Sequence, residues 1–129
     1  MSIAHKIKVL VVDDQVTSRL LINDMLLQLG FTKITIAQDG EQGARIMRQQ
    51  PHHLVISDYA MPKMDGLVLL HSIRTNPATK KAAFIMVTGQ GSRELVHKAA
   101  ALGANNVLAK PFTIEKLKAA IEMVFGELA

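Results

Sequence analysis

Five polar side chains that could do chemistry each stand just after a short apolar run of the sequence. These residues are Asp13, Asp14, Asp58, Thr88 and Lys110. If the apolar runs are parallel strands of one sheet, their carboxyl ends share an edge, and open α/β sheets bind ligands at that edge. The sequence therefore predicts a site that combines three carboxylates, one hydroxyl and one ammonium group.

A cluster of three carboxylates favours a bound cation. The like charges repel one another, and burial raises the pKa of a carboxyl group that has no partner. An all-oxygen cluster of this charge suits Mg²⁺. Lys110 could add a mobile ammonium, and the hydroxyl of Thr88 could donate a hydrogen bond to an oxyanion. These groups predict a magnesium site that can stabilise further negative charge.

Asp58 is the best candidate for a nucleophile. A carboxylate can attack phosphorus and form an aspartyl phosphate while a metal ion and a lysine neutralise the transferred charge. Asp58 is the only acidic residue at the end of its apolar run, and the turn-rich segment 59–66 keeps this strand end open. The chain has neither a Gly-rich P-loop nor a Gly-x-Ser-x-Gly motif, which weakens nucleotide-binding and serine-hydrolase interpretations.

Five short apolar runs supply the strands that must position these residues. The predicted strands are 9–12, 34–37, 54–56, 83–87 and 107–109. Most are continuous and rich in β-branched residues, which is typical of buried strands, whereas the second alternates more and is predicted at an edge. Because helix-length segments separate the runs, we expect a parallel sheet with right-handed crossovers.

Amphipathic segments between the strands predict five helices. The first ends at Gly30, a residue suited to the left-handed conformation that follows a helix. Its apolar stripe comprises Leu21, Ile22, Met25, Leu26 and Leu29. The others are predicted at 41–50, 67–76, 92–103 and 113–125. Ser92 and Thr113 are the predicted N-caps of the last two. The fifth helix is expected to bury the face formed by Ile114, Leu117, Ile121, Val124 and Phe125.

The composition predicts one α/β domain over residues 1–129, without a linker, a repeat or an effector domain. Hydrophobic residues make up 49% of the chain and charged residues 20%, which is unlike a disordered protein. The absence of cysteine excludes disulfides, thiol catalysis and cysteine-based zinc sites, and it fits a reducing compartment. No apolar stretch suits a signal peptide or a membrane span, so we expect a cytoplasmic protein that does not bind membranes.

The basic character of the chain raises the question of nucleic-acid binding. The net charge is +4 and the sequence pI is about 9.6. Lys and Arg are nevertheless scattered, with only Lys80 and Lys81 adjacent, and four Phe and one Tyr offer few rings for stacking. This distribution favours a solvated basic surface over a nucleic-acid site.

Several motifs occur in an order and spacing that are highly specific. They are Val11-Val12-Asp13-Asp14, the segment 58–66, Thr88-Gly89 and Lys110-Pro111-Phe112, supported by Leu29-Gly30-Phe31 and Asp39-Gly40. With these motifs the chain resembles the response-regulator receiver domains over essentially its whole length, and among them the stand-alone chemotaxis regulators. The resemblance implies a flavodoxin-like fold, with a five-stranded parallel sheet in the order 2-1-3-4-5 and helices on both faces. It also implies a cis peptide bond between Lys110 and Pro111.

The resemblance implies a phosphorylation switch rather than an enzyme, although such a switch can catalyse its own phosphorylation and dephosphorylation. Asp58 would accept a phosphoryl group from a histidine kinase. Thr88 would bind the phosphoryl oxygens, and Lys110 would pair with Asp58 or with the phosphate. The expected protein is a monomer. It would bind the flagellar motor switch protein or another chemotaxis protein, or it would serve as a phosphate sink, and the residues do not choose between these outputs.

The resemblance also implies a specific set of magnesium ligands. Asp14 and Asp58 would bind Mg²⁺ directly, together with the backbone carbonyl of Ala60. Asp13 would act through a water molecule. No other cofactor is expected.

Two departures from the family pattern affect the output of this switch. Val107 stands where the family usually has an aromatic residue on the fifth strand, and a short β-branched side chain cannot swing inward as a ring would. Coupling to the fourth and fifth helices should therefore be weaker or different. Ala60 replaces the longer polar side chain of the chemotaxis regulators. Ala60 and Gln90 flank the expected path of attacking water, so the lifetime of the aspartyl phosphate is open.

Two other functions are compatible with some of these residues. An aspartyl-nucleophile phosphatase usually has a second acid two residues after the nucleophile, and that position is Ala60. A scaffold without chemistry would not need the complete set of acidic residues.

A few further residues allow two interpretations. Tyr59 could lie over the site and limit access, or it could be an ordinary half-exposed residue at a strand end. The segment 93–102 could be a surface for a partner or an ordinary amphipathic helix. His52 and His53 are expected in a solvated loop. Met61 and Met64 are expected to pack the loop after Asp58.

Overall fold

Five parallel strands form one sheet in the order β2-β1-β3-β4-β5 in the computed structural model, which describes residues 3–89 and 91–128. The strands are β1 (Lys8–Val12), β2 (Lys33–Ala37), β3 (Leu54–Asp58), β4 (Ala83–Thr88) and β5 (Asn106–Ala109). All neighbours pair in parallel. The predicted order and the predicted edge position of β2 are confirmed, and the predicted strand bounds differ from these by no more than two residues.

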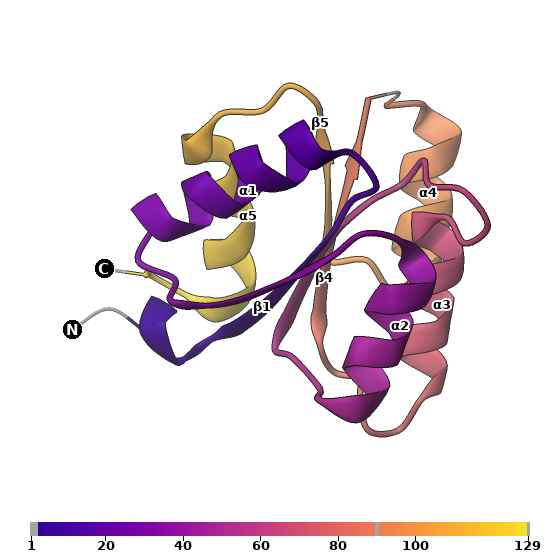
Figure 1. Ribbon diagram of the computed structural model, residues 1–129. Coiled ribbons are helices and arrows are strands. Elements are labelled where there is room, and N and C mark those ends of the chain that lie inside the picture. Colours follow the sequence, from indigo (N-terminus) through magenta and orange to yellow (C-terminus); the bar gives the residue numbers. More distant parts are fainter. Residues whose placement is uncertain (1–2, 90, 129) are drawn as a thin grey trace.

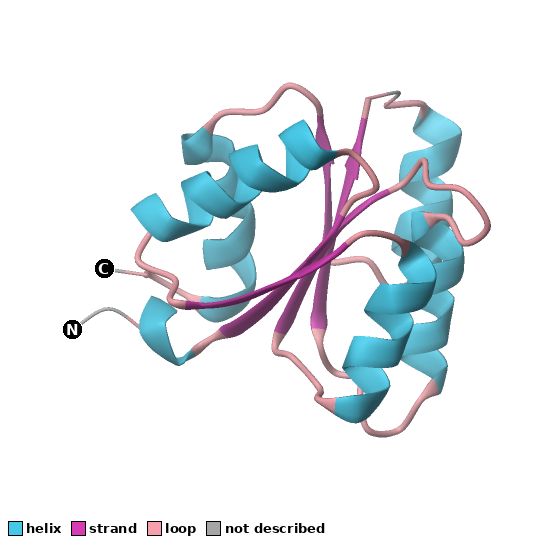
Figure 2. Cartoon of the chain, viewed as in Figure 1, coloured by secondary structure: helices cyan, strands magenta, loops and turns pink. Residues whose placement is uncertain are grey.

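Helices cover both faces of the sheet (Figure 1). They are α1 (Val16–Gln28), α2 (Gly40–Gln49), α3 (Gly66–Thr75), α4 (Arg93–Leu102) and α5 (Ile114–Phe125), and a short 3-10 helix, η1 (Ala4–Lys6), precedes β1. Helices α1 and α5 lie on one face, and α2, α3 and α4 lie on the other. Figure 2 shows the twisted strands between the two helical layers. The predicted flavodoxin-like α/β fold is confirmed.

The alternation of side chains along each strand divides the interior into two cores. Val9 and Val11 point into the core under α1 and α5. Leu10 and Val12 point into the core under α2, α3 and α4. Both sets are fully buried because successive residues of a strand face opposite sides of the sheet. A continuous apolar run is therefore the pattern expected of a strand with a helical layer on each side.

Four of the helices have an N-cap residue whose side chain accepts a hydrogen bond from the first turn, at the carboxyl edge of the sheet. Ser92 accepts a hydrogen bond from the backbone N–H of Leu95, and Thr113 accepts one from that of Lys116, so both predicted caps are confirmed. Asp39 and Asp65 cap α2 and α3 in the same way. The glycines predicted after α1 and α4 adopt positive φ angles, 97° at Gly30 and 101° at Gly103, as a left-handed helix end requires.

The predicted apolar stripe of α1 is partly wrong. Ile22 and Leu26 are buried, but Leu21 is 55% exposed. Helix α1 carries apolar residues on most of its surface, so hydrophobicity alone does not reveal which side packs on the sheet. Its outer side remains exposed at Val16, Leu20 and Leu27. On α5, Val124 is also more exposed than predicted, because Ala120 faces the core beside Ile121.

His52 lies in the interior instead of a solvated loop, which corrects the expectation for this residue. Its ring nitrogens lie 2.7 Å from the carbonyl oxygen of Gln50 and 2.9 Å from the hydroxyl of Thr35. Burial lowers the pKa of His52. These contacts satisfy the polar groups of a neutral ring. His53 is exposed as expected, and its Nδ1 accepts a hydrogen bond from the backbone N–H of Lys8.

No helix in the described part of the chain is both long and apolar enough to cross a bilayer.

Replacement of Gly66 by alanine should destabilise the fold. A Cβ at this position would lie 2.5 Å from the sulfur of Met86 and 2.6 Å from the carbonyl oxygen of Asp58. We expect Gly66→Ala to lower the free energy of unfolding by about 1–3 kcal/mol, as overpacking of a core does. Chemical denaturation would measure the change. Gly91→Ala is the control, since its nearest contact would be the Cβ of Ala109 at 3.9 Å. Equal stability of the two variants would contradict the prediction.

Candidate functional site

The three aspartates lie together at the carboxyl edge of β1 and β3. Val12, the last residue of β1, pairs with Ser57 of β3, so the residues that follow these two lie side by side. One carboxylate oxygen from each of Asp13, Asp14 and Asp58 lies within 4.8 Å of the other two. We call these residues the acidic cluster. The sheet order reverses at β1, with β2 on one side and β3 on the other, and such a point is where open α/β sheets form a binding crevice.

Asp13 is held by hydrogen bonds on several sides. Its backbone N–H donates to the carbonyl oxygen of Ala37 at 3.2 Å. Its Oδ1 accepts from the backbone N–H of Gln15 at 2.9 Å, and its carbonyl oxygen accepts from the guanidinium of Arg19 at 2.8 Å. The side chain is fully buried. Asp13 therefore has a fixed position, whereas Asp14 is exposed at the mouth of the site.

Lys110 places its ammonium between two carboxylates. Its Nζ lies 3.1 Å from Oδ2 of Asp13 and 3.5 Å from Oδ2 of Asp58. The backbone N–H of Lys110 donates to the carbonyl oxygen of Thr88 at 2.8 Å, which ties the loop after β5 to β4. The peptide bond between Lys110 and Pro111 is cis, as the resemblance implied. The lysine thus partly neutralises the acidic cluster from the β5 side.

The carboxyl group of Asp58 is electrostatically unfavourable in its charged form. Burial raises the pKa of Asp58 most, and the charge of Asp13 raises it further. The ammonium of Lys110 and the backbone N–H of Tyr59, which donates to Oδ1 at 2.9 Å, oppose this rise without cancelling it. The three carboxylates of the acidic cluster carry more negative charge than the single ammonium of Lys110 can neutralise. A divalent cation would supply that charge.

The donors around the acidic cluster fit Mg²⁺. All three side chains offer carboxylate oxygens, and the exposed Asp14 leaves one side open to water. Mg²⁺ prefers one or two carboxylates and keeps several waters. Among the described residues, this is the only group of three or more His, Cys, Asp or Glu side chains close enough to share an ion.

A hollow of about 400 Å³ opens beside the acidic cluster. We call it the site hollow. Its lining consists of Gln15, Asp58, Tyr59, Ala60, Thr88, Gly89 and Lys110. The side chain of Thr88 is almost fully buried in its wall, whereas Ala60 is exposed at the rim. The space beside Asp58 is large enough for a phosphoryl group and water. Gln90, expected beside the path of water, lies outside the described residues.

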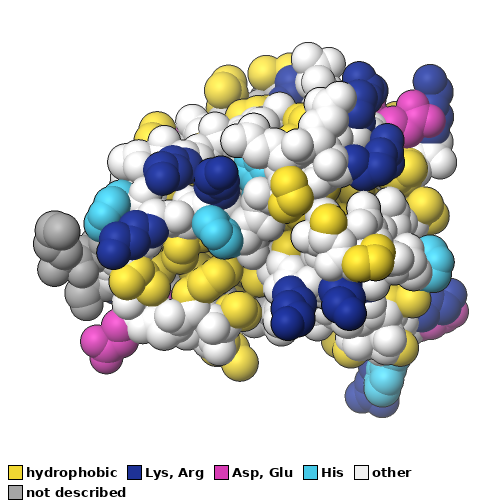
Figure 3. Space-filling view, turned by 90° about the horizontal axis from the view of Figure 1, so that it is seen from below, with side chains coloured by type: hydrophobic (Ala, Val, Ile, Leu, Met, Phe, Trp, Pro, Cys, Tyr) yellow, Lys and Arg dark blue, Asp and Glu magenta, His cyan; other side chains and the backbone are white. Residues whose placement is uncertain are grey.

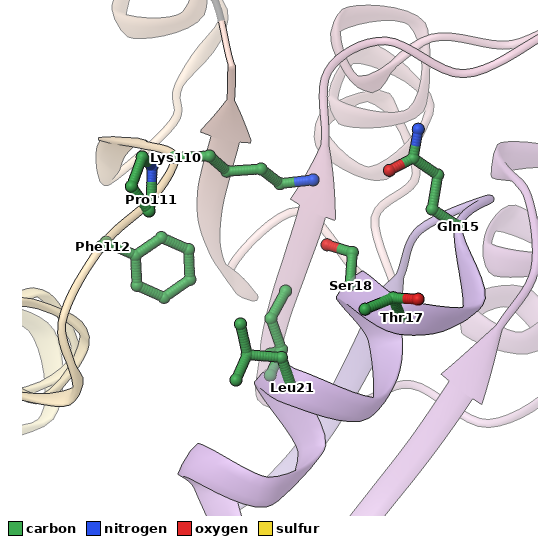
Figure 4. Close-up of a pocket in the computed structure, with 8 residues that line it drawn as sticks. Gln15, Thr17, Ser18, Leu21, Lys110, Pro111 and Phe112 are labelled. Carbon is green, nitrogen blue, oxygen red and sulfur yellow. The ribbon is translucent and has the colours of Figure 1, made fainter.

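An apolar groove adjoins the site hollow on the α1 side (Figure 4). We call it the α1 groove. It measures about 370 Å³ and is lined by Gln15, Thr17, Ser18, Leu21, Ile22, Lys110, Pro111 and Phe112. In Figure 4 the ring of Phe112 and the side chain of Leu21 form one end, and Lys110 reaches past them toward Gln15. Gln15 and Lys110 line both the groove and the site hollow.

The structure brings the predicted side chains together and adds residues that sequence reasoning missed. Asp13, Asp14, Asp58 and Lys110 are in contact or close together, and Thr88 lines the same hollow. Gln15 and Arg19 were not predicted. The only signal for these contacts with Asp13 was the place of the two residues in the chain: Gln15 follows Asp14 as the N-cap of α1, and Arg19 lies four residues later on the helix. Met61 and Met64 pack in the core under α2 and α3, as expected.

Basic side chains gather at the opposite edge of the sheet. Figure 3 views the molecule from below and shows Lys, Arg and His side chains over this face, with few Asp or Glu. Lys8 and Lys33 are direct cross-strand partners at the start of β1 and β2. The acidic cluster lies at the carboxyl edge instead. The net charge of +4 therefore says little about the chemistry of the site.

Comparison with known proteins identifies the family. Residues 9–122 match the response regulator receiver domain. The chain is 73% identical to a probable chemotaxis protein CheY of Rhizobium etli, over 99% of both chains. It is 36% identical to the chemotaxis protein CheY of Pseudomonas aeruginosa, over 92% of this chain and 95% of that one.

Solved structures agree with this result. The BeF3-activated response regulator CheY2 with Mg²⁺ from Sinorhizobium meliloti is 75% identical over 100% of both chains, with a TM-score of 0.75. A CheX–CheY complex with BeF3 and magnesium from Borrelia burgdorferi has a TM-score of 0.86 at 30% identity, over 92% of this chain and 89% of that chain. Receiver domains bind Mg²⁺ in an acidic pocket, and they are phosphoacceptor switches rather than turnover enzymes. The chain belongs to the response regulator receiver domain family and is a CheY-like regulator of two-component signalling.

Proposed function

We propose that the chain accepts a phosphoryl group on Asp58 from a histidine kinase and thereby changes its affinity for a protein of the chemotaxis pathway. The observation that carries the proposal is the acidic cluster, whose carboxylate oxygens lie within 4.8 Å of one another beside an open hollow. The match to a probable chemotaxis protein CheY over nearly the whole chain supports the pathway.

The residues of the site have complementary roles in this transfer. An oxygen of Asp58 attacks the phosphorus, the bond between phosphorus and the kinase histidine breaks, and its electron pair returns to the imidazole. Lys110 balances the charge beside Asp58, and Thr88 donates its hydroxyl to a phosphoryl oxygen. In the reverse direction water attacks the phosphorus and the bond to Asp58 breaks. The side chain of Ala60, exposed at the rim, is apolar and cannot orient that water.

Asp14 and Asp58 would hold Mg²⁺ directly, with the backbone carbonyl of Ala60, and Asp13 would act through water. When bound, the ion neutralises the oxygens of the transferred phosphoryl group. The hydrogen bonds that fix Asp13 and the exposure of Asp14 suit these different roles.

The α1 groove supports a protein rather than a small molecule as phosphodonor. An apolar surface lined by Leu21, Pro111 and Phe112 adjoins the exposed apolar side of α1 at Val16 and Leu20. Exposed apolar surface of this kind marks protein contacts. Because the groove and the site hollow share Gln15 and Lys110, a kinase seated there would present its histidine to Asp58.

In its phosphorylated form the protein would bind the flagellar motor switch protein or another chemotaxis protein, or it would serve as a phosphate sink. We propose that the protein is monomeric and cytoplasmic, and that the receiver domain passes on its signal by binding another protein. The complex of a relative with CheX, described for Borrelia burgdorferi, supports binding to a chemotaxis protein.

The proposal is tested by incubation with a small acyl phosphate and Mg²⁺, followed by intact mass and peptide mapping. We expect one phosphoryl group on the peptide that contains Asp58. We also expect a chelator of Mg²⁺ to prevent its addition, because the acidic cluster alone would repel the incoming phosphate. No gain of mass in the presence of Mg²⁺, or an unchanged gain after chelation, would overturn the proposal.

A further inference from the structure

A hollow at the amino edge of the sheet carries positive charge far from the acidic cluster. It measures about 270 Å³, and we call it the basic hollow. Its lining consists of Lys8, Thr32, Lys33, Ile34, Thr35, Gln50 and His52. Lys8 begins β1 and Asp13 follows the last residue of that strand, so about 16 Å of strand separates the basic hollow from the acidic cluster. The two sites are therefore distinct.

Two lysines stand side by side in the wall of the basic hollow. Lys8 and Lys33 are cross-strand partners in the parallel pair of β1 and β2, so their side chains leave the same face of the sheet. Neither forms an ion pair with any described residue, and no residue that lines the hollow is acidic. Like charges on neighbouring strands repel each other. The hollow therefore has an excess of positive charge that a bound anion would relieve.

A buried histidine and a half-buried threonine complete the polar lining of the basic hollow. His52 is only 5% exposed. Its Nδ1 lies 2.7 Å from the carbonyl oxygen of Gln50, which can only accept, so this nitrogen carries a proton. Nε2 of the neutral ring is then an acceptor, and the hydroxyl of Thr35 donates to it at 2.9 Å. The hydroxyl proton of Thr35 is thus engaged as long as His52 is neutral.

Protonation of His52 would free the hydroxyl of Thr35 for a ligand. With a proton on both nitrogens the ring can only donate, so Thr35 accepts from Nε2 and turns its own hydroxyl proton away from the ring. That hydroxyl can then donate a hydrogen bond to an anion held by Lys8 and Lys33 in the same hollow. An anion in the basic hollow and a proton on His52 would therefore stabilise each other.

The charged groups that line the two hollows containing His52 are all basic. They are Lys8 on β1, Lys33 on β2, the neighbouring His53, and Lys81 in a second hollow of about 340 Å³, and Arg48 lies in the last turn of α2. Burial lowers the pKa of His52 most, and the charges of Lys8 and His53 lower it further, although its hydrogen bond to a backbone carbonyl opposes this. A bound anion would favour the charged ring, so its binding should be coupled to uptake of a proton.

We propose that the basic hollow binds a tetrahedral dianion, either free phosphate or the phosphate group of a small molecule, through Lys8, Lys33 and the hydroxyl of Thr35, with uptake of a proton by His52. Two ammonium groups match the charge of a phosphate group, and lysine is a common phosphate ligand in proteins. The volume of about 270 Å³ leaves room for the anion and water. The proposal does not depend on phosphorylation of Asp58.

The test follows backbone amide chemical shifts of the ¹⁵N-labelled wild type during titration with inorganic phosphate, at constant ionic strength and without Mg²⁺. The amides of Lys33 and Thr35 should shift and saturate with a dissociation constant of about 1 mM or lower. The amide of Gly89, beside the acidic cluster, should not respond. Methyl phosphate is the second titrant. Equal affinity for methyl phosphate would show that the hollow accepts a phosphate group carried by a small molecule, and binding at least tenfold weaker would assign the hollow to the free ion.

Two substitutions identify the groups that hold the anion. Lys33→Ala and Thr35→Val should each weaken phosphate binding by about tenfold, as expected for loss of one hydrogen bond to a charged group. Thr35→Ser should restore most of the affinity, which separates a missing hydroxyl from a disturbed strand. Lys80→Ala is the matched control, because Lys80 is exposed in the loop before β4 but lines neither hollow, and it should bind phosphate like the wild type.

The imidazole nitrogen shifts of His52 measure the uptake of the proton. Sulfate is the probe here, because its own charge does not change near neutral pH. Saturation with sulfate should raise the pKa of His52 by about one pH unit, and the affinity for sulfate should increase as the pH falls through that pKa. His53→Gln removes the neighbouring exposed histidine and should leave both effects in place.

Shifts that stay linear in anion concentration and spread over exposed lysines elsewhere would be screening of surface charge and would overturn the proposal. The same result is expected if Lys8 and Lys33 only complement the carboxyl end of α2, where a helix favours cations. Equal affinity of the wild type, Lys33→Ala and Thr35→Val would also overturn it. Saturable binding with an unchanged pKa of His52 would overturn the uptake of a proton by this histidine.

Discussion

Asp58→Asn should abolish phosphoryl incorporation completely and, in the absence of Mg²⁺, should make the protein more stable than the wild type. Asparagine has nearly the shape of aspartate but cannot form an acyl phosphate, so no covalent phosphate is expected by intact mass. The gain in stability follows from the surroundings of Asp58. The residue is 7% exposed and shares the site with Asp13 and Asp14. Removal of one of three like charges relieves both repulsion and desolvation.

The sign of the stability change follows from the pKa. Burial raises the pKa of Asp58 in the folded protein, so the folded state holds this proton more tightly than the unfolded state does. The ionised carboxylate therefore costs stability, and this cost grows as the pH rises through the unfolded-state pKa toward the raised pKa of the folded state. We expect Asp58→Asn to raise the free energy of unfolding by about 1 kcal/mol, as replacement of buried charges can.

Chemical denaturation at neutral pH with a chelator would measure this change, and addition of Mg²⁺ should stabilise the wild type more than the variant. Asp24→Asn is the control, because Asp24 is exposed on α1, far along the chain from the acidic cluster, and its Oδ2 accepts a hydrogen bond from the side chain of Gln28 at 2.8 Å. It should be phosphorylated normally, with unchanged stability. Phosphate found on Asp58→Asn would assign the acceptor to another residue, and a loss of stability would show that Asp58 is not under electrostatic strain.

The strands and the main polar residues of the site could be predicted from the sequence because both depend on short-range patterns. Continuous apolar runs are required of strands buried on both faces, and a parallel sheet brings every strand end to one edge. Asp13, Asp58, Thr88 and Lys110 therefore converge whatever the details of packing. The same reasoning found Ser92 and Thr113, because capping depends only on a side chain and a backbone N–H within the same turn.

Features that depend on packing between distant segments could not be predicted in this way. Leu21 and Ile22 are equally apolar, and only the placement of α1 against α5 and the sheet decides that Ile22 is buried. His52 is buried because Thr35, seventeen positions away, offers a hydroxyl at 2.9 Å. The sequence left Tyr59 with two interpretations, and the structure fits both: the residue is half-buried and also borders the site.

The exposure of Leu21 has a functional meaning that its predicted burial would have hidden. An inward Leu21 would only have strengthened the core, whereas the exposed side chain forms one end of the α1 groove. Helix α1 can therefore support the sheet with Ile22 and Leu26 and still offer an apolar surface to a partner. The two roles explain why apolar residues surround this helix.

Lys110→Ala should slow phosphorylation by about 100-fold while strengthening the binding of Mg²⁺. The ammonium of Lys110 lies 3.1 Å from Asp13 and 3.5 Å from Asp58, where it can balance charge that the phosphoryl group brings. Loss of one preorganised charge-stabilising group typically costs a factor of this size. The lysine also repels a metal ion that binds the same carboxylates. Its removal should therefore tighten Mg²⁺ binding. When a chelator removes Mg²⁺, the carboxylates of the variant are left without a positive partner, so its free energy of unfolding should be about 1–3 kcal/mol lower than that of the wild type.

The two effects distinguish a role in phosphoryl transfer from a structural role. The initial rate of phosphoryl incorporation measures the effect on phosphorylation, and titration of Tyr59 fluorescence with Mg²⁺ measures the affinity for the ion. Lys110→Arg keeps the charge but replaces a compact ammonium by a planar fork, so it should recover only part of the rate. Lys116→Ala, an exposed lysine of α5, should change neither quantity. If Lys110→Ala weakened Mg²⁺ binding and slowed the reaction in parallel, the lysine would act by holding the acidic cluster in place. Opposite changes in the two quantities require that its charge acts on the transferred group, since loss of the ligand geometry cannot strengthen the binding of the ion.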